Sequence, residues 1–363
     1  MNVKALTFAV LVCMAHSVQA QEFAGLGFAG LGGDATGFAT PDPTYRLTFP
    51  ADHASHPDFR IEWWYLTASL RGADGHDYGV QWTLFRSALQ PHEGEGWQSP
   101  QMWMGHAALT TRTQHYLAER LARGGIGQAG VTSAPFEAWI DEWRMAGSED
   151  LSAQSLSTPS LSTLSLRAGG SEFAYDLDLS AYGPLVLHGD SGYSVKSAGG
   201  QASLYYSQPS YAVTGTLMLP GGPVEVTGKG WLDREWSSQP LSADQTGWDW
   251  FSLSFDDGAR MMGFALRGKG APFVSGTWIA ADGTSQPLSG DALQLEPLRH
   301  ATVAGRRVPV QWRVRVPSRG VDVQVSALND QAWMGTRFPY WEGPVLVSGS
   351  HDGRGYLEMT GYQ

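Results

Sequence analysis

The chain has 363 residues, 42% of them hydrophobic, and its 24 Lys and Arg residues stand against 35 Asp and Glu residues, a formal net charge of −11. This apolar content excludes general disorder, and the length suggests about two domains that each bury a core. Because phosphate backbones are bound by clustered Lys and Arg, the acidic balance argues against nucleic acid as a partner.

Residues 1–20 have the pattern of a secretory signal peptide. Lys4 precedes an apolar stretch from Ala5 to Met14, and short side chains up to Ala20 suit cleavage after that residue. The apolar stretch is too short to span a bilayer. The only cysteine, Cys13, lies in this segment. A mature chain without cysteine favours the periplasm of a Gram-negative bacterium over a disulfide-stabilised extracellular module.

The segment 21–44 is rich in Gly and Ala and is expected to be a flexible leader. From Tyr45 onward, short runs of Val, Leu, Trp, Tyr and Thr alternate with polar residues and are interrupted by turn-forming residues about every ten positions. We therefore predict an all-β protein whose strands include Ile61–Leu70, Tyr78–Arg86, Met102–Thr110, Pro223–Trp236, Trp248–Phe255, Met261–Arg267, Val308–Val316, Val321–Ala327, Pro344–Ser350 and Gly355–Thr360.

The number of strands has a consequence for the architecture. Many short antiparallel strands need closure to remove sheet edges, and a single barrel of ~320 residues is unusual for a soluble protein. We predict two consecutive barrels or sandwiches, at 45–240 and 241–363, with the boundary near Pro240. The second has the size of a small up-and-down barrel, and such barrels commonly enclose an apolar ligand cavity.

Two short motifs suggest chemistry that the rest of the sequence does not develop. The motif GDSG at 189–192 resembles the nucleophile loop of chymotrypsin-like proteases, but that family's histidine context and disulfides are missing, so we interpret it mainly as a turn. The segment 52–58, DHASHPD, combines imidazoles and carboxylates that suit a divalent metal. Spacing marks no further ligands, so we interpret this segment as a polar loop that caps a barrel and predict no metal site.

The expected strand at 61–70 carries an acidic residue among aromatic ones. Glu62 and Trp64 share one face of the strand, while Trp63 and Tyr65 share the other. Large aromatics on both faces indicate a strand that is buried on both sides or lines a cavity on one. Burying Glu62 is costly unless a donor such as Arg60 pairs with it. A structural Glu–Arg pair and a catalytic carboxylate both remain open.

The strongest local signal is the run GWLDREWSS at 230–238. Alternation puts Trp231, Asp233 and Glu235 on one face, with the two carboxylates about 6.7 Å apart along the strand. Beside indole rings, one acid of such a pair can be held protonated while the other stays charged. Downstream, Trp248 and Trp250 also share a face. The alternative, in which the acids pair with arginines and the rings are core, has equal support from the residues alone.

A set of motifs between Asp52 and Tyr362 resembles the lipocalin-like AttH/CrtC family, which contains secreted "predicted hydrolases" and the carotenoid 1,2-hydratases. The resemblance implies two tandem lipocalin-like, calycin-type antiparallel barrels. The motifs that carry it are, in chain order, DHASHPDFRIEWWYLTASL, WMGHAAL, VLHGDSGYSVK, SLYYS, GKGWLDREWSS, GWDWFSLSFDDG, YWEGPVLVSG and GYLEMTGY.

The resemblance also implies a mechanism. In carotenoid hydratases, water adds to a terminal isoprenoid double bond without a cofactor, and the Asp of a Tyr-x-Asp motif is proposed to protonate the alkene. The matching residue is Asp233, although Trp231 here replaces the Tyr. Aromatic faces stabilise the resulting cation by about 2 kcal/mol or more per ring when dry. The candidates for that lining are Trp64, Trp231, Trp248 and Trp250.

We therefore expect an exported, cofactor-independent hydratase or hydrolase that acts on an apolar molecule such as an isoprenoid, a carotenoid or a lipid. Asp233 is the expected general acid, Glu235 and Glu62 are supporting candidates, and the remaining candidates for binding or orienting the ligand are Tyr206, His106 and His188. A non-catalytic carrier of lipid or pigment is one alternative, and it predicts that an arginine pairs with Asp233. A surface attachment factor is another, and it predicts an exposed apolar patch and no deep pocket.

Overall fold

The computed structural model describes residues 35–147, 161–239 and 244–362. The expected signal peptide at 1–20 and most of the expected leader lie outside these ranges, and so does Pro240, near which the sequence places the domain boundary. Within the described ranges the protein is all-β, with short 3-10 turns, and it contains no helix long and apolar enough to cross a membrane.

The first antiparallel sheet has 13 strands in the described part of the chain. They are β1 (Ile61–Gly72), β2 (Asp77–Ala88), β3 (Gln101–Thr110), β4 (His115–Arg123), β5 (Ala129–Ser133), β6 (Phe136–Ile140), β7 (Trp143–Gly147), β8 (Thr163–Gly169), β9 (Ala174–Ala181), β10 (Val186–Leu187), β11 (Tyr193–Val195), β12 (Ala202–Leu219) and β13 (Gly222–Ser237). Their order is β4-β3-β2-β1-β13-β12-β9-β8-β7-β6-β5, with β10 and β11 also paired to β12.

The second antiparallel sheet has 10 strands in the same described ranges. They are β14 (Gln245–Phe255), β15 (Arg260–Gly268), β16 (Phe273–Ile279), β17 (Ser285–Ser289), β18 (Gln294–Val303), β19 (Arg306–Val316), β20 (Val321–Ala327), β21 (Trp333–Met334), β22 (Tyr340–Gly349) and β23 (Gly353–Met359). Their order is β17-β16-β15-β14-β23-β22-β20-β19-β18, with β21 paired to β22.

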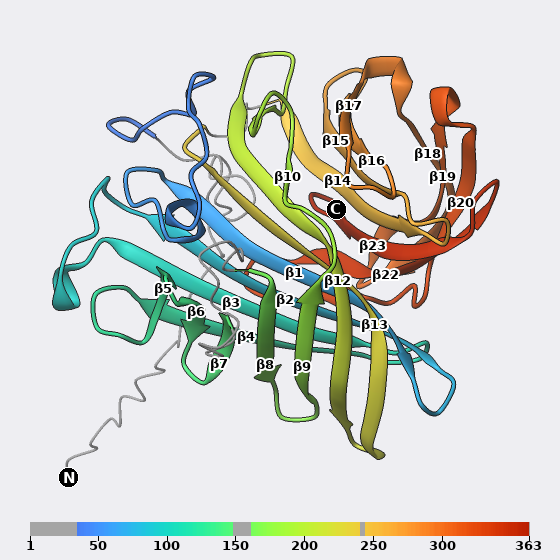
Figure 1. The fold of residues 1–363 in the computed structure, drawn as a ribbon, viewed down its shortest axis with the longest axis horizontal. Coiled ribbons are helices and arrows are strands. Elements are labelled where there is room, and N and C mark those ends of the chain that lie inside the picture. Colours follow the sequence, from blue (N-terminus) through green and yellow to red (C-terminus); the bar gives the residue numbers. More distant parts are fainter. Residues whose placement is uncertain (1–34, 148–160, 240–243, 363) are drawn as a thin grey trace, which may run out of the picture.

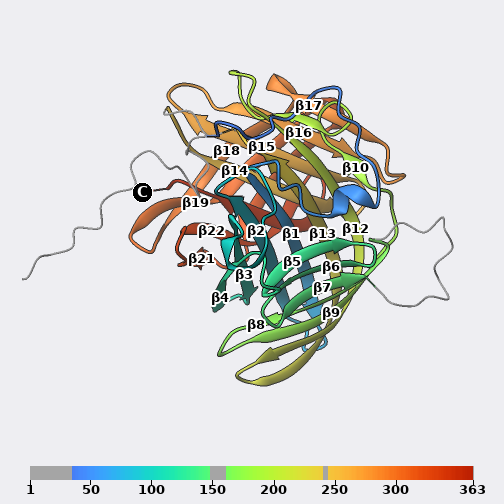
Figure 2. The ribbon, with the colours of Figure 1, turned by 90° about the vertical axis from the view of Figure 1, so that its left-hand side faces the viewer.

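Short 3-10 turns punctuate the strands at Ala51–His53, Gly96–Gln98, Gly290–Ala292 and Pro317–Arg319. Each strand that we expected from the sequence is present, and both sheets are curved into barrel-like or half-barrel shapes (Figures 1 and 2), as expected for two lipocalin-like barrels. The first sheet ends at Ser237 and the second begins at Gln245.

Strand β1 is buried on both faces because each face packs against a different part of the molecule. Trp64, Leu66 and Leu70 belong to the core of the first barrel. Tyr65 and the partly buried Trp63 belong to a separate aromatic cluster that includes residues of the second sheet. A strand covered on both sides reads as a nearly continuous apolar run, which is why the segment from Ile61 onward lacks simple alternation.

Strand β12 changes partners along its length. Its pairing with β13 shifts between Gln208 and Tyr211, where an irregularity interrupts the register. The part of β12 after the irregularity pairs with β9, and the part before it pairs with β10 and β11. Tyr206 and Tyr211 are separated by an even number of residues, so regular alternation would place them on opposite faces of the strand. The extra residue at the irregularity brings both into the core of the first barrel.

The two sheets pack against each other through the outer face of the first barrel. Strands β1 and β2 lie against β23 and β22, and Figure 1 shows the red strands of the second sheet beside the blue β1. Tyr65, Tyr205 and Trp231 of the first sheet meet Trp250 and Tyr356 of the second in the aromatic cluster. The inside of the second barrel is filled by its own core, which includes Phe251, Leu253, Trp312, Trp341 and Leu357.

Candidate active site

A cavity of about 520 Å³ lies between the two sheets rather than inside either barrel. The expectation that the second barrel encloses the cavity therefore needs correction, since both barrels contribute to its wall. Alternation on β13 turns Asp233 and Glu235 toward the cavity, and their neighbours on β1, Tyr65 and Trp63, stand in register beside them. The second sheet contributes Glu358 of β23 and the indoles of β14.

Asp233 is a buried carboxyl whose described partners are all neutral. The Tyr205 hydroxyl donates to its Oδ2 at 2.8 Å, the Trp231 indole Nε1 donates to its Oδ1 at 2.6 Å, and the Ser207 hydroxyl also donates to Oδ1. Burial raises the pKa of Asp233 to about 7; the three donors oppose this shift and the charge of Glu235 adds to it. At pH 7 a large fraction of this buried carboxyl therefore holds a proton.

Glu235 has a different environment two residues further along the strand. Its Oε1 lies 2.8 Å from Lys196 Nζ and accepts a hydrogen bond from the Ser203 hydroxyl. The Lys196 ammonium also lies 4.3 Å from the ring centre of Tyr205 and 5.1 Å from that of Phe264. This ion pair places a cation in the same cavity wall as Asp233.

Glu358 brings a third carboxyl from the second sheet. It lines the cavity and accepts a hydrogen bond from Trp248 Nε1 at 2.7 Å. Burial raises the pKa of Glu358 to about 7; the indole donor opposes this shift, and the negative charges of Asp233 and Glu235 increase it. The cavity therefore holds two carboxyls, one from each sheet, that both titrate near neutral pH.

Glu342 on β22 is a fourth acid, buried behind the cavity wall. The Tyr65 hydroxyl donates to Glu342 Oε1, which connects β1 of the first sheet to the second sheet. Burial raises the pKa of Glu342 well above its usual range, and the nearby Glu358 adds to the shift while the hydroxyls of Tyr65 and Tyr340 oppose it. Tyr65 also packs edge-on against Trp250, with ring centres 5.2 Å apart.

Aromatic side chains from both sheets form most of the remaining wall near the carboxyls. Trp248 and Trp250 share one face of β14, as alternation predicts, because the intervening Asp249 points away and pairs with Arg267 at 3.0 Å. Trp231 is not among the lining residues and donates to Asp233 from two positions earlier on β13. The aromatic lining comprises Trp63, Tyr65, Phe85, Trp103, Trp248, Trp250, Phe264, Phe338 and Tyr340.

His188 stands behind the cavity wall and supports Asp233 through a serine. Its Nε2 lies 2.6 Å from Ser207 Oγ, and its Nδ1 lies 2.8 Å from Thr277 Oγ1 of the second sheet. The ring stacks on Tyr205 with centres 4.0 Å apart. Burial lowers the pKa of His188 well below its usual value, so the ring is neutral and orients the Ser207 hydroxyl that faces Asp233.

His106 of β3 forms another connection between the sheets. Its Nδ1 lies 3.0 Å from the Tyr340 hydroxyl and its Nε2 lies 3.4 Å from Glu119 Oε1. The side chain is fully buried, and burial lowers its pKa although Glu119 opposes the shift. His106 is not itself a lining residue, but it contacts two that are, Tyr340 and Phe85.

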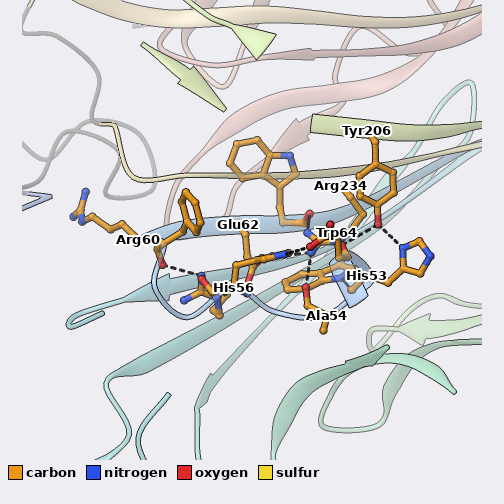
Figure 3. A network of polar contacts seen from close by, with 12 residues as sticks. His53, Ala54, His56, Arg60, Glu62, Trp64, Tyr206 and Arg234 are labelled. Carbon is orange, nitrogen blue, oxygen red and sulfur yellow. Dashed lines mark hydrogen bonds and ion pairs between the residues drawn. The ribbon is translucent and has the colours of Figure 1, made fainter. Parts of the chain in front are cut away.

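Glu62 lies on the face of β1 opposite Asp233, in a network of its own (Figure 3). Its carboxylate contacts Arg86 Nε at 2.5 Å, His56 Nδ1 at 3.0 Å and Arg234 at 3.4 Å. Burial alone raises the pKa of an acid, but the charge of Arg86 and the other two partners outweigh it and hold the pKa of Glu62 far below its usual range. This carboxylate is fully buried among its cationic partners, and the residue is also among those that line the cavity.

Trp64 and Tyr206 belong to the same network and not to the cavity. The guanidinium of Arg234 lies 3.8 Å from the ring centre of Trp64, whose indole nitrogen donates to the His53 carbonyl at 3.0 Å. The Tyr206 hydroxyl lies 2.6 Å from His53 Nδ1 (Figure 3). Both side chains are fully buried in the first barrel, on the far side of the sheet from Asp233.

The GDSG motif at 189–192 and the segment 52–58 have structural roles in their described contacts. Ser191 is an exposed turn residue at φ 56°, and its hydroxyl contacts only the adjacent Asp190 in the described hydrogen bonds. In the segment 52–58, His56 lies 3.2 Å from Asp52 and stacks on Trp236 at 3.9 Å. Within the residues that the structure describes, no group of three or more His, Cys, Asp or Glu side chains is arranged to hold a metal ion.

Sequence reasoning did not single out several groups that surround Asp233. Tyr205 and Ser207 alternate along the SLYYS motif, so pairing that strand with β13 would have revealed them. Glu358 lies in the GYLEMTGY run, which carries the resemblance but no local signal for chemistry. Lys196 stands in a short loop-like segment with no pattern that could indicate its ion pair.

A model of the AttH-like family matches residues 40–362. Among solved structures, an AttH candidate from Nitrosomonas europaea is 32% identical, the match covering 90% of this chain and 99% of that one, with a TM-score of 0.78. Kievitone hydratase from Nectria haematococca is 16% identical, with 89% and 98% coverage and a TM-score of 0.63, which is a likeness of fold. A search of curated proteins found no match. Because the family model spans nearly all of it, the chain belongs to the AttH-like family.

Proposed function

We propose that the protein is an exported hydratase that adds water to a carbon–carbon double bond of an apolar, isoprenoid-like molecule, with Asp233 as the general acid. The observation that carries this proposal is the buried Asp233 carboxyl, which faces an aromatic cavity and has only neutral described partners. A carboxyl that keeps its proton near neutral pH is suited to protonate a weakly basic alkene.

The reaction begins with transfer of the Asp233 proton to one alkene carbon. The π electron pair forms the new C–H bond, which leaves a carbocation at the more substituted carbon and a carboxylate on Asp233. The donors from Tyr205, Ser207 and Trp231 are already aimed at the Asp233 oxygens and stabilise the charge that appears there. Their positions do not have to change during the step, so little reorganisation is required.

The carbocation has no hydrogen-bonding group, so we assign its stabilisation to the aromatic side chains of the cavity wall. Ring faces attract cations by about 2 kcal/mol or more when water is excluded. Trp63, Tyr65, Trp248 and Trp250 line the cavity beside Asp233, so they are the residues to which we assign this role. Water then attacks the cationic carbon and loses a proton, which gives a tertiary alcohol.

The apolar residues at the opening of the cavity favour an apolar substrate. Three lining residues at its rim are exposed to solvent although they are apolar: Leu89 (68%), Met102 (40%) and Leu121 (42%). The volume of about 520 Å³ lies in the range of small-molecule sites. A greasy ligand that leaves water at this rim would contact apolar side chains before it reaches the carboxyls.

The comparisons support the class of reaction and leave the substrate to experiment. The solved structure from Nectria haematococca that shares the fold is named a hydratase, and its name supports the same reaction class for this chain. The export component rests on residues 1–20 of the sequence, and we retain the periplasm of a Gram-negative bacterium as the proposed location.

The alternatives make different demands on the same cavity. A lipid or pigment carrier is expected to neutralise Asp233 with an arginine, whereas the described partners of Asp233 are a tyrosine, a serine and an indole. A surface attachment factor is expected to lack a deep pocket. The environment of Asp233 therefore favours catalysis over storage.

The test has two stages and one matched control. Native mass spectrometry of the protein purified from its own envelope identifies any bound molecule, and a panel of prenylated compounds is then incubated with the protein in 18O-labelled water. We expect products that gain one labelled water, and an Asp233→Asn variant that is slower by about 10²–10⁴-fold. Asp249→Asn is the control, because Asp249 is another buried acid with a raised pKa but pairs with Arg267 outside the cavity. Equal turnover by Asp233→Asn and the wild type would contradict the proposal.

A further inference from the structure

One carboxyl in the cavity has no part in the proton donation described above. Glu358 stands on β23, and its neighbours across the second sheet are Trp250 on β14 and Glu342 on β22. It lines the cavity and is only partly exposed, and its described hydrogen-bond donor is the neutral indole of Trp248 at 2.7 Å. Burying an acid without a cationic partner lowers the stability of the fold, and this cost points to a chemical function for Glu358.

The position of Glu358 is complementary to that of Asp233. Asp233 belongs to the wall formed by the first sheet, and Glu358 belongs to the wall formed by the second. A substrate in the cavity between the sheets therefore has one carboxyl on each side. Hydration needs two proton movements, one toward the alkene and one away from water, so two acids on facing walls match the reaction.

Glu235 is less suited to the second proton movement. Its carboxylate is already in an ion pair with Lys196 at 2.8 Å and accepts a hydrogen bond from Ser203. A proton delivered there would break that ion pair. Glu358 has no cation among its described contacts, and it gains a proton without such a loss.

We propose that Glu358 is the second acid–base group of this site and takes the proton that the attacking water loses; this inference rests on the hydratase function proposed above. Before reaction, Asp233 is protonated and Glu358 is ionised. The alkene π pair binds the Asp233 proton, a lone pair of water forms the C–O bond, and the released proton moves to Glu358. Return of that proton to Asp233 through water restores the site, and no atom is oxidised or reduced.

The charges around the pair support a shared proton. The negative charges of Asp233 and Glu235 raise the pKa of Glu358, so its ionisation depends on the state of the opposite wall. Both acids titrate at about 7, where the singly protonated pair is well populated. The other titratable groups beside the pair include Glu235, Lys196, Tyr205, Tyr65, Tyr340 and Glu342.

The kinetic test compares the wild type with Glu358→Gln and Asp249→Asn on a prenylated compound that the wild type hydrates. Gln keeps an oxygen that can accept the Trp248 hydrogen bond but cannot take a proton. We expect a rate about 100-fold lower for Glu358→Gln and the loss of the acidic limb of its pH–rate profile. Asp249→Asn should keep both limbs. Glu358→Gln with an unchanged rate and both limbs would overturn the inference and leave the role of Asp233 intact.

A second readout needs no substrate. Infrared difference spectra of 13C-Asp-labelled protein, assigned with Asp233→Asn, follow the ionisation of Asp233 with pH. Removing the negative charge of Glu358 should lower the pKa of Asp233 by roughly one unit in Glu358→Gln, and Asp249→Asn should not shift it. If no tested compound is hydrated but this shift occurs, the hydratase function fails and the shared proton stands. If the shift is absent, the two carboxyls do not share a proton and the inference is wrong.

Discussion

The two faces of the β1–β13 strand pair contain buried acids of opposite character. On the inner face, Glu62 is surrounded by Arg86, Arg234 and His56, and its pKa lies far below the usual range because Arg86 outweighs the effect of burial. On the outer face, Asp233 has hydroxyl and indole donors only, and burial raises its pKa to about 7. Burial is similar on both faces, so the partners decide the protonation state.

This difference separates a structural role from a chemical one. The inner network ties the segment 52–62 to two strands of the barrel, and its carboxylate is held by arginine partners. The outer carboxyl keeps a transferable proton at the wall of a cavity. An acid with arginine partners holds the fold together, and an acid with neutral donors can exchange a proton.

The largest expected effect comes from breaking the inner network. Glu62→Gln keeps the shape of the side chain but leaves Arg86 and Arg234 buried without their carboxylate. We expect the free energy of unfolding to fall by about 3–5 kcal/mol, as for other broken buried ion pairs. Urea titration at neutral pH measures this loss, and an unchanged midpoint would show that the network does not stabilise the fold.

The outer face should respond to pH in the opposite sense. Because the folded pKa of Asp233 is raised, its contribution to stability is present below the unfolded value near 3.8 and is lost as the pH rises through about 7. Relative to Asp233→Asn, the wild type should lose up to about 4 kcal/mol of unfolding free energy across that interval. Parallel stability curves for the two proteins from pH 4 to 7 would show that Asp233 is not protonated in the fold.

A smaller expected effect tests how the neutral donors change the pKa of Asp233. The Trp231 indole donates to Asp233 at 2.6 Å and favours its ionised form. Trp231→Phe keeps the ring but removes the donor, so the pKa of Asp233 should rise further by roughly half a unit to one unit. The midpoint of Asp233 ionisation, measured by infrared titration, reports this directly. A midpoint that stays constant or falls would mean that the indole does not act on the carboxylate.

Local patterns in the sequence were sufficient for the architecture. The period-two run Val308–Val316 lies within β19, because pleated strands place alternate residues on opposite faces, and the aromatic-rich run Ile61–Leu70 lies within β1. The cavity between the barrels was not predictable in this way. It depends on how two complete sheets dock, and no local period encodes which outer face packs against which partner.

The candidate site was predictable in part for the same reason. Alternation placed Asp233 and Glu235 together, and the structure turns both to the cavity. Alternation did not reveal which face of β1 is turned to the cavity. In the structure, Glu62 and Trp64 lie on the opposite face, in the inner network. Glu358 was beyond local reasoning, because it meets Asp233 across the cavity only after the last strand has joined the second sheet.

The central claim is that Asp233 holds a proton near neutral pH while Glu62 does not. The most direct measurement is 13C NMR of protein with labelled Asp and Glu carboxyls, titrated from pH 3 to 9 and assigned with Asp233→Asn and Glu62→Gln. We predict that the Asp233 signal titrates with a midpoint near 7 and that the Glu62 signal stays in its ionised position throughout. An Asp233 signal that is already ionised at pH 5 would contradict the account.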